Sequence, residues 1–138
     1  MNTTKQTAPA PHLRRAATVL AAAAAGLAVW AVAGPLAGVD LDASGQHVGG
    51  PQVALTGLLA GAVSWLLLTG LERFTSRPRR AWTMFGGISL VLSCTGPFTA
   101  DGVAAGAVLV LLHLAVGLTL LLGLRATLKD APCAPAAA

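Results

Sequence analysis

The amino-acid sequence predicts an all-α membrane protein in which four transmembrane helices form a bundle, with both chain ends in the cytoplasm. Three observations lead to this prediction. Apolar residues make up 55% of the 138 residues and charged residues only 10%, whereas a soluble domain usually carries about 25% charged residues. Four long apolar runs are separated by short polar segments. The basic residues gather in clusters beside these runs, which is typical of membrane topology signals.

The first apolar run predicts a helix over about residues 16–36. At about 1.5 Å per residue, some 20 residues span a hydrocarbon core of about 30 Å. Residues 1–13 before it are polar and contain proline, so we expect a disordered cytoplasmic tail. A basic start, an apolar core and Ala31-Val32-Ala33 are also typical of a cleaved secretory signal. We favour a retained helix, because signal cores usually run about 7–15 residues.

The segment between the first two helices is polar and rich in glycine. Residues 39–42 alternate apolar and acidic side chains, and Ser44-Gly45 then offers a turn. This pattern predicts a short β-hairpin or an ordered loop at the outer surface.

Three side chains of this loop, Asp40, Asp42 and His47, also suggest a metal or ligand site. Aspartate, serine and glycine are ordinary turn residues, however. We therefore favour a solvated outer loop, and the sequence predicts no metal site and no cofactor.

Prolines mark the boundaries of the next helices. Pro51 suits the first turn of the second helix, where its missing N–H would be unpaired in any case. Pro78 blocks helix continuation through the loop that follows, and Trp82 is placed where an interfacial anchor belongs. The predicted helices lie over about 52–71, 81–96 and 103–124, within a transmembrane domain over 14–125 that is followed by a disordered cytoplasmic tail over 126–138.

The loop from Glu72 to Arg80 determines the orientation of the chain, because it holds four of the nine Lys and Arg residues. The positive-inside rule places such a loop in the cytoplasm. With four helices, every other basic residue falls on the same side. The charged residues of the two outer loops are Asp40, Asp42 and Asp101, all of them acidic. The topology determinants are Arg14, Arg15, Arg73, Arg77, Arg79, Arg80, Arg125 and Lys129. The predicted location is the bacterial plasma membrane, crossed several times.

His113 is the only ionisable residue deep in a predicted span. Ionisable groups within a membrane are candidate functional sites, so a proton relay or a ligand site is one interpretation. The other is a neutral histidine that bonds to Ser64, Ser89 or Ser93 and links the helices. We favour the second, because no span contains an acidic partner. These four residues form the candidate intramembrane polar site.

Small residues follow one face of several predicted helices. Gly57 and Gly61 are spaced i, i+4, which allows close helix contact within the bundle or dimerisation. We favour contact within the bundle. Two further stripes are Gly86, Ser89, Ser93 and Gly96 on the third helix, and Gly106, Val110, His113 and Gly117 on the fourth.

Composition narrows the possible functions. The basic clusters lie between apolar runs, tyrosine is absent and aromatics are 4%, so nucleic-acid binding is not expected. The two cysteines, Cys94 and Cys133, fall on opposite sides of the predicted membrane. No predicted span contains paired carboxylates, a histidine cluster, or a Cys/His or Ser/His arrangement at catalytic spacing, so we expect no enzyme.

The main hypothesis is a structural or accessory component of the membrane. The alternative is a small oligomeric transporter or channel that uses His113 and the Ser89/Ser93 face. A homodimer or a larger membrane complex is possible under either hypothesis.

Several short motifs together resemble one family. They are Trp30 with Pro-Leu-Ala-Gly-Val-Asp-Leu at 35–41, Leu-Glu-Arg at 71–73, Arg-Ala-Trp at 80–82, Ser-Cys-Thr-Gly-Pro at 93–97 and His-Leu-Ala-Val at 113–116. The chain resembles, from about Arg14 to Arg125, an uncharacterised family of small actinobacterial membrane proteins with a domain of unknown function. The resemblance implies four spans and a retained first helix. It implies no activity, cofactor or catalytic residue.

Overall fold

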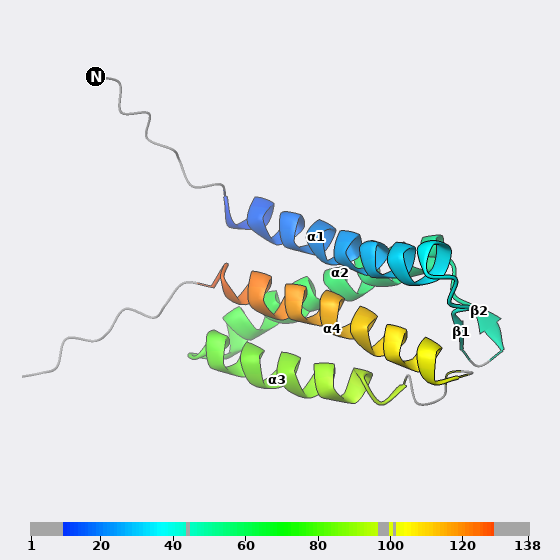
Figure 1. Ribbon diagram of the computed structural model, residues 1–138. Helices are drawn as coiled ribbons and strands as arrows, with labels where there is room; N and C mark the ends of the chain where they lie inside the picture. The colour runs from blue at the N-terminus through cyan, green and yellow to red at the C-terminus, as the bar shows by residue number, and fades with distance from the viewer. Residues whose placement is uncertain (1–9, 44, 97–99, 101, 129–138) are drawn as a thin grey trace, which may run out of the picture.

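The computed structural model describes residues 10–43, 45–96, 100 and 102–128. Within these residues, four α-helices lie side by side and a small β-hairpin stands at one end (Figure 1). The elements in order are α1 (Pro11–Ala31), the π-helix η1 (Val32–Leu36), β1 (Asp42–Ala43), β2 (Gln46–His47), α2 (Gly50–Phe74), α3 (Pro78–Ser93) and α4 (Val103–Arg125).

Proline occupies the first turn of α1, α2 and α3. This position suits proline, whose ring fixes a helical φ and whose missing N–H has no partner there. The helices therefore begin earlier than the apolar runs indicate. Residues 11–13, predicted as a disordered tail, are helical in α1, and α3 begins at Pro78 and not near residue 81. The other residues of that tail, 1–9, lie outside the described residues.

The start of the predicted C-terminal tail also differs from expectation. Residues 126–128 form a turn after α4, and Leu128 is buried in the hydrophobic core. This apolar side chain, three positions after the end of α4, is enough to hold the segment against the bundle. Residues 129–138 are not among those described.

The π-helix η1 contains Pro35. Because proline has no N–H to donate, a regular helical bond is lost at this position, and a wider turn is one way to accommodate it. The amide of Ala37 bonds to the Val32 carbonyl at 2.9 Å. Gly38 follows with φ +69°, the left-handed conformation that commonly ends a helix.

The β-hairpin predicted between the first two helices is present as a two-residue antiparallel pairing. Asp42 faces His47 and Ala43 faces Gln46 across it. Trp30 of α1 fixes the base of this hairpin, because its Nε1–H donates to the Val48 carbonyl at 2.9 Å. Leu41 is 1% exposed and contributes apolar packing at the same place.

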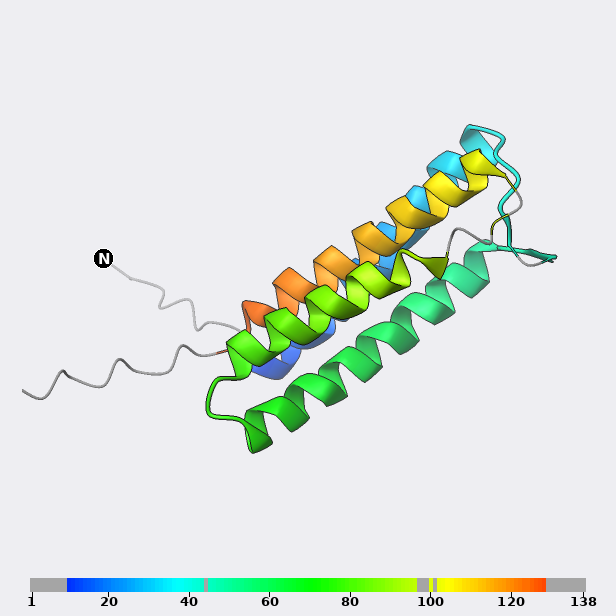
Figure 2. The same cartoon turned by 90° about the horizontal axis from the view of Figure 1, so that it is seen from below.

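Helix α1 is central to the packing, since it contacts both α2 and α4, while α3 packs mainly on α4 (Figure 2). The Gly57 and Gly61 face of α2 lies against α1: a Cβ at Gly57 would lie 3.2 Å from the Ala23 Cα, and one at Gly61 would lie 2.5 Å from Val19 Cγ1. The small residues thus serve contact within the bundle, which is the alternative that the sequence favoured.

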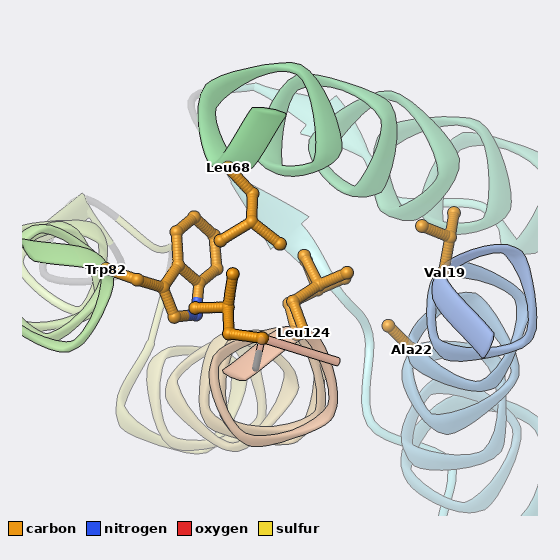
Figure 3. Packing of buried hydrophobic residues seen from close by; sticks show 7 residues of the cluster. Val19, Ala22, Leu68, Trp82 and Leu124 are labelled. Carbon is orange, nitrogen blue, oxygen red and sulfur yellow. The ribbon is translucent and has the colours of Figure 1, made fainter. Parts of the chain in front are cut away.

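The hydrophobic core lies in the half of the bundle nearest the chain ends. Figure 3 shows Leu68 of α2, Trp82 of α3 and Leu124 of α4 converging there. Trp82 is 3% exposed, and its Nε1–H donates to the Leu121 carbonyl at 3.0 Å. The sequence predicted Trp82 as an interfacial anchor. That prediction is wrong, because the indole points into the bundle and finds its polar partner on α4.

Within the described residues, three helical segments are long and apolar enough to cross a membrane: Pro11–Leu36, Gly50–Phe74 and Val103–Arg125. Helix α3 has 16 residues, or about 24 Å at about 1.5 Å per residue. The predicted fourth span therefore stays a prediction.

Candidate functional site

The predicted polar residues line two cavities between α2, α3 and α4. The larger, of about 380 Å³, lies toward the hairpin end and is lined by His113, Ser93, Gln52 and Thr56 among apolar residues and glycines. The smaller, of about 190 Å³, lies toward the chain ends and is lined by Ser64, Ser89 and Ser93.

The two cavities meet. Ser93, Gly117 and Leu120 line both of them. The structure thus places Ser93 beside His113 in one cavity and beside the other two predicted serines in the next. Helix α4 can approach α3 here because position 117 is glycine, where a side chain would collide with Leu90.

The hydrogen bond of His113 differs from the expected link between helices. Its Nδ1 lies 2.7 Å from the Leu109 carbonyl, one turn earlier in the same helix. A carbonyl only accepts, so Nδ1 carries the proton, and Nε2 is an acceptor in the neutral ring. Ser93 likewise donates to the Leu90 carbonyl of its own helix at 2.9 Å. Both side chains thus satisfy a donor locally and keep lone pairs for another partner.

A second polar cluster joins three segments at the end of the bundle where the chain ends lie. The Arg15 guanidinium pairs with the Glu72 carboxylate at 2.7 Å, and its Nε–H donates to Thr127 Oγ1 at 3.1 Å. Arg15 was predicted as a topology determinant, and its side chain is only 6% exposed. A buried guanidinium requires a partner of opposite charge, which Glu72 supplies.

The Arg15 cluster borders a hollow of about 320 Å³ that His12, Pro78 and Leu128 also line. The His12 ring stacks on Trp65, with 6.3 Å between ring centroids. The Arg15 cluster, formed by Arg15, Glu72 and Thr127, joins α1, α2 and the turn after α4 and is called the clasp below. Because Glu72 neutralises the charge of Arg15, this guanidinium does not offer an unpaired charge to the hollow.

The topology determinants lie together at this same end. All seven arginines of the chain are among the described residues, and they lie at the start of α1, the end of α2, the start of α3 and the end of α4 (Figure 1). Lys129 lies outside the described residues. The hairpin, at the opposite end, carries Asp42 and His47.

In the outer loop, His47 Nδ1 lies 3.1 Å from Asp42 Oδ1, and both side chains are exposed. Among the described residues, no group of three or more His, Cys, Asp or Glu could hold a metal ion. The pair is explained by cross-strand register, since Asp42 and His47 face each other in the hairpin.

Sequence reasoning missed four polar residues: Glu72, Thr127, Gln52 and Thr56. Glu72 is the only glutamate of the chain, and a lone acid within an arginine cluster is a signal for an ion pair. Thr127 had been assigned to the tail. Gln52 and Thr56 lie one turn apart on α2, a spacing that places them on one face.

Comparison with known proteins yields no match among curated proteins and none among solved structures. A family model does match, over residues 6–130, and its description is a family of unknown function. This match confirms the resemblance to an uncharacterised domain family, and it covers the whole helical region. The chain belongs to the family of unknown function DUF6069.

Proposed function

We propose that this protein is a multi-pass component of the bacterial plasma membrane with a structural or accessory role, whose four helices all cross the bilayer. The observation that supports this most directly is the distribution of charge. The seven arginines lie at one end of the bundle together with both ends of the described chain. Anionic headgroups and the positive-inside bias would hold that end in the cytoplasm.

The sides of the bundle support a lipid environment. Large apolar side chains are exposed on each helix, with Leu66 74%, Val91 70% and Leu122 58% exposed. A water-soluble monomer rarely exposes a continuous apolar surface of this kind. In a bilayer such residues face hydrocarbon and need no partner.

Helix α3 is proposed as the fourth span despite its length. It runs antiparallel to α4 and packs on it between the two ends of the bundle (Figure 2). A span shorter than the hydrocarbon core is accommodated by thinning of the bilayer and by snorkelling of flanking residues. Arg77 precedes α3 and Arg80 lies in its first turn, at the proposed cytoplasmic end, where long basic side chains can extend toward headgroups.

The accessory role is proposed over an enzymatic one because the polar groups are engaged locally. His113 and Ser93 each bond to a carbonyl of their own helix, and neither bond activates a nucleophile by a general base. The Arg15–Glu72 pair joins helices, which is a structural role.

Membrane placement can be tested by cysteine accessibility in intact cells. In a background of Cys94→Ala and Cys133→Ala, Arg79→Cys should react with a membrane-impermeant maleimide only after permeabilisation. Gly45→Cys, in the hairpin turn, should react in intact cells. Reaction of Arg79→Cys from outside would refute the proposed topology, and equal reaction at both sites before permeabilisation would refute crossing altogether.

The accessory role requires its own experiment. The tagged protein should be purified in mild detergent and its bound proteins identified by mass spectrometry. The variant Leu66→Ser, which changes the lipid-facing surface, should be purified in the same way and its bound proteins compared with those of the wild type. A stoichiometric membrane partner would support the role. Recovery of the protein without any stoichiometric membrane partner, together with proton-coupled flux in liposomes, would contradict it.

A second candidate function, a small oligomeric transporter, is favoured by the continuity of the two cavities through Ser93. Together their linings reach from Val48 beside the hairpin to Trp82 near the arginine-rich end. This function predicts a homodimer with proton-coupled flux in liposomes, lost in His113→Leu. Liposomes without flux under a pH gradient would exclude it.

A further inference from the structure

We propose that the cavity beside His113 binds a neutral lipid that carries a hydroxyl group. The hydroxyl donates to His113 Nε2, and the hydrocarbon chain leaves between α2 and α3 into the bilayer. This inference rests on the proposed membrane placement and adds a ligand class to the intramembrane site.

The size and walls of the cavity fit a bound molecule. Its volume of about 380 Å³ falls in the range of small-molecule sites, about 300–1,000 Å³. The core around Leu68, Trp82 and Leu124 lies in the opposite half of the bundle, where the connected cavity is the smaller one, of about 190 Å³.

Helix α1 closes the back of the cavity. A Cβ at Gly26 would lie 2.9 Å from Val116 Cγ2 and 3.4 Å from Val53 Cγ1, and both valines line the cavity. This close contact leaves no opening for a ligand beside Gly26 on the α1 side.

The open side of the cavity lies along α2. Gln52, Thr56 and Ala60 line the cavity and are also exposed. Ser93, at the end of α3, lines the cavity from the opposite side, and Figure 1 shows α2 and α3 separating with distance from their connecting loop. In the proposed placement this opening faces hydrocarbon, so a ligand that dissolves in lipid can reach it without crossing water.

The lining selects against charge. The residues that line the cavity in the described part of the chain include histidine, serine, threonine and glutamine but no Lys, Arg, Asp or Glu. A phosphate or carboxylate headgroup would be buried there without a cation, which is strongly unfavourable. The cavity is therefore suited to an uncharged ligand.

The polar groups of the cavity can accept a hydrogen bond from the ligand. His113 uses Nδ1–H on the Leu109 carbonyl, so its Nε2 presents a lone pair. Ser93 uses its O–H on the Leu90 carbonyl and also keeps lone pairs. A hydroxyl group can donate to one of these acceptors and accept from Thr56 or Gln52, whereas a pure hydrocarbon leaves all of them unpaired.

Photolabelling of the full-length protein in nanodiscs tests this inference. The probes are a long-chain alcohol with a tail diazirine and its methyl ether, which has the same tail but no donor. We expect the alcohol to label residues of α2 and α4 around the cavity about fivefold more than the ether, the factor given by a net hydrogen bond of about 1 kcal/mol. Equal labelling by the two probes would overturn the proposal.

Matched variants locate the site. Ala60→Leu should fill the opening and reduce labelling by the alcohol several-fold, while Ala62→Leu, also exposed on α2 but outside the cavity lining, should leave it unchanged. His113→Leu should abolish the preference for the alcohol. If that variant does not fold, the alcohol-to-ether ratio in the wild-type protein and the Ala60/Ala62 comparison still decide.

The result is separable from the proposed function. If cysteine accessibility supports the topology and the two probes label equally, the ligand site is wrong and the membrane placement stands. If Arg79→Cys reacts from outside, the membrane placement fails whatever the probes do.

Discussion

The Arg15 guanidinium and the Glu72 carboxylate meet at 2.7 Å where the start of α1 passes the end of α2. Their environments differ, because the Arg15 side chain is 6% exposed and that of Glu72 is 33% exposed. Thr127 accepts a second bond from the same guanidinium and brings in the turn after α4. One side chain thus fixes three segments at the arginine-rich end.

Removing the carboxylate should leave this guanidinium buried and without its counter-charge. We expect Glu72→Gln to lower the free energy of unfolding by about 1–3 kcal/mol, below the value for a fully buried pair because water reaches Glu72. Denaturation by SDS in mixed micelles measures this. Arg14→Gln, at the exposed neighbouring position, is the control, and an equal effect of the two substitutions would contradict the clasp.

Two glycines of α2 provide a matched pair for the packing against α1. Gly61→Ala should cost about 1–3 kcal/mol, because the new Cβ would lie 2.5 Å from Val19 Cγ1 and 3.1 Å from its Cβ, and a β-branched side chain adjusts poorly. Gly70→Ala meets nothing within 4 Å and should be neutral or stabilising by up to about 1 kcal/mol. Thermal unfolding in detergent compares them.

A second substitution can test whether the stability lost in Gly61→Ala comes from the collision with Val19. Val19→Ala should recover part of the stability lost in Gly61→Ala, since it removes the atoms that collide. If Gly61→Ala and Gly70→Ala unfold at the same midpoint, the close contact of α1 and α2 is not present in solution.

Trp82 should report a buried environment and not the membrane interface. In a protein with Trp30→Phe and Trp65→Phe, Trp82 emission should be blue-shifted and weakly quenched by acrylamide, because the indole is 3% exposed. Brominated lipids should also quench it weakly. Strong quenching by lipids brominated near the headgroup would instead restore the anchoring role that its position beside Arg80 suggests.

Trp30 should control the order of the hairpin. Trp30→Phe keeps an aromatic side chain but removes the N–H that bonds to the Val48 carbonyl at 2.9 Å, and it shortens the ring system that lies against Gly50. The loss of about 1 kcal/mol should raise amide hydrogen exchange about fivefold over residues 41–48 with little change in α2. Trp65→Phe is the comparison, and identical exchange in both variants would show that the hairpin does not depend on this bond.

Hydropathy and proline placement predicted four helices, and the alternation at 39–42 with the turn at Ser44-Gly45 predicted the hairpin, because all these signals act locally along the chain. Their ends were less predictable. An apolar run reports which residues suit hydrocarbon, whereas a helix continues as long as its backbone bonds can form. Pro11 and Pro78 therefore start their helices before the apolar residues begin.

The candidate site was predictable only in part. Helical spacing brought Ser89 and Ser93 to one face, and the structure places both at cavities with Ser64 or His113. The contribution of Gln52 and Thr56 depends on how α2 faces α4, which no local pattern encodes. The partner of His113 was also mistaken, since a carbonyl of its own helix, at 2.7 Å, competes successfully with hydroxyls on other helices.

Helix α3, with 16 residues, has a further consequence for the surrounding lipid. If it spans the membrane as proposed, the annulus of acyl chains beside α3 must be compressed relative to that beside α2, which has 25 residues. The bilayer around the protein would then be thinner on the α3 side than on the α2 side. This difference favours a location in thin regions of membrane. It also favours association of two copies through their α3 sides, where both would compress the same lipid.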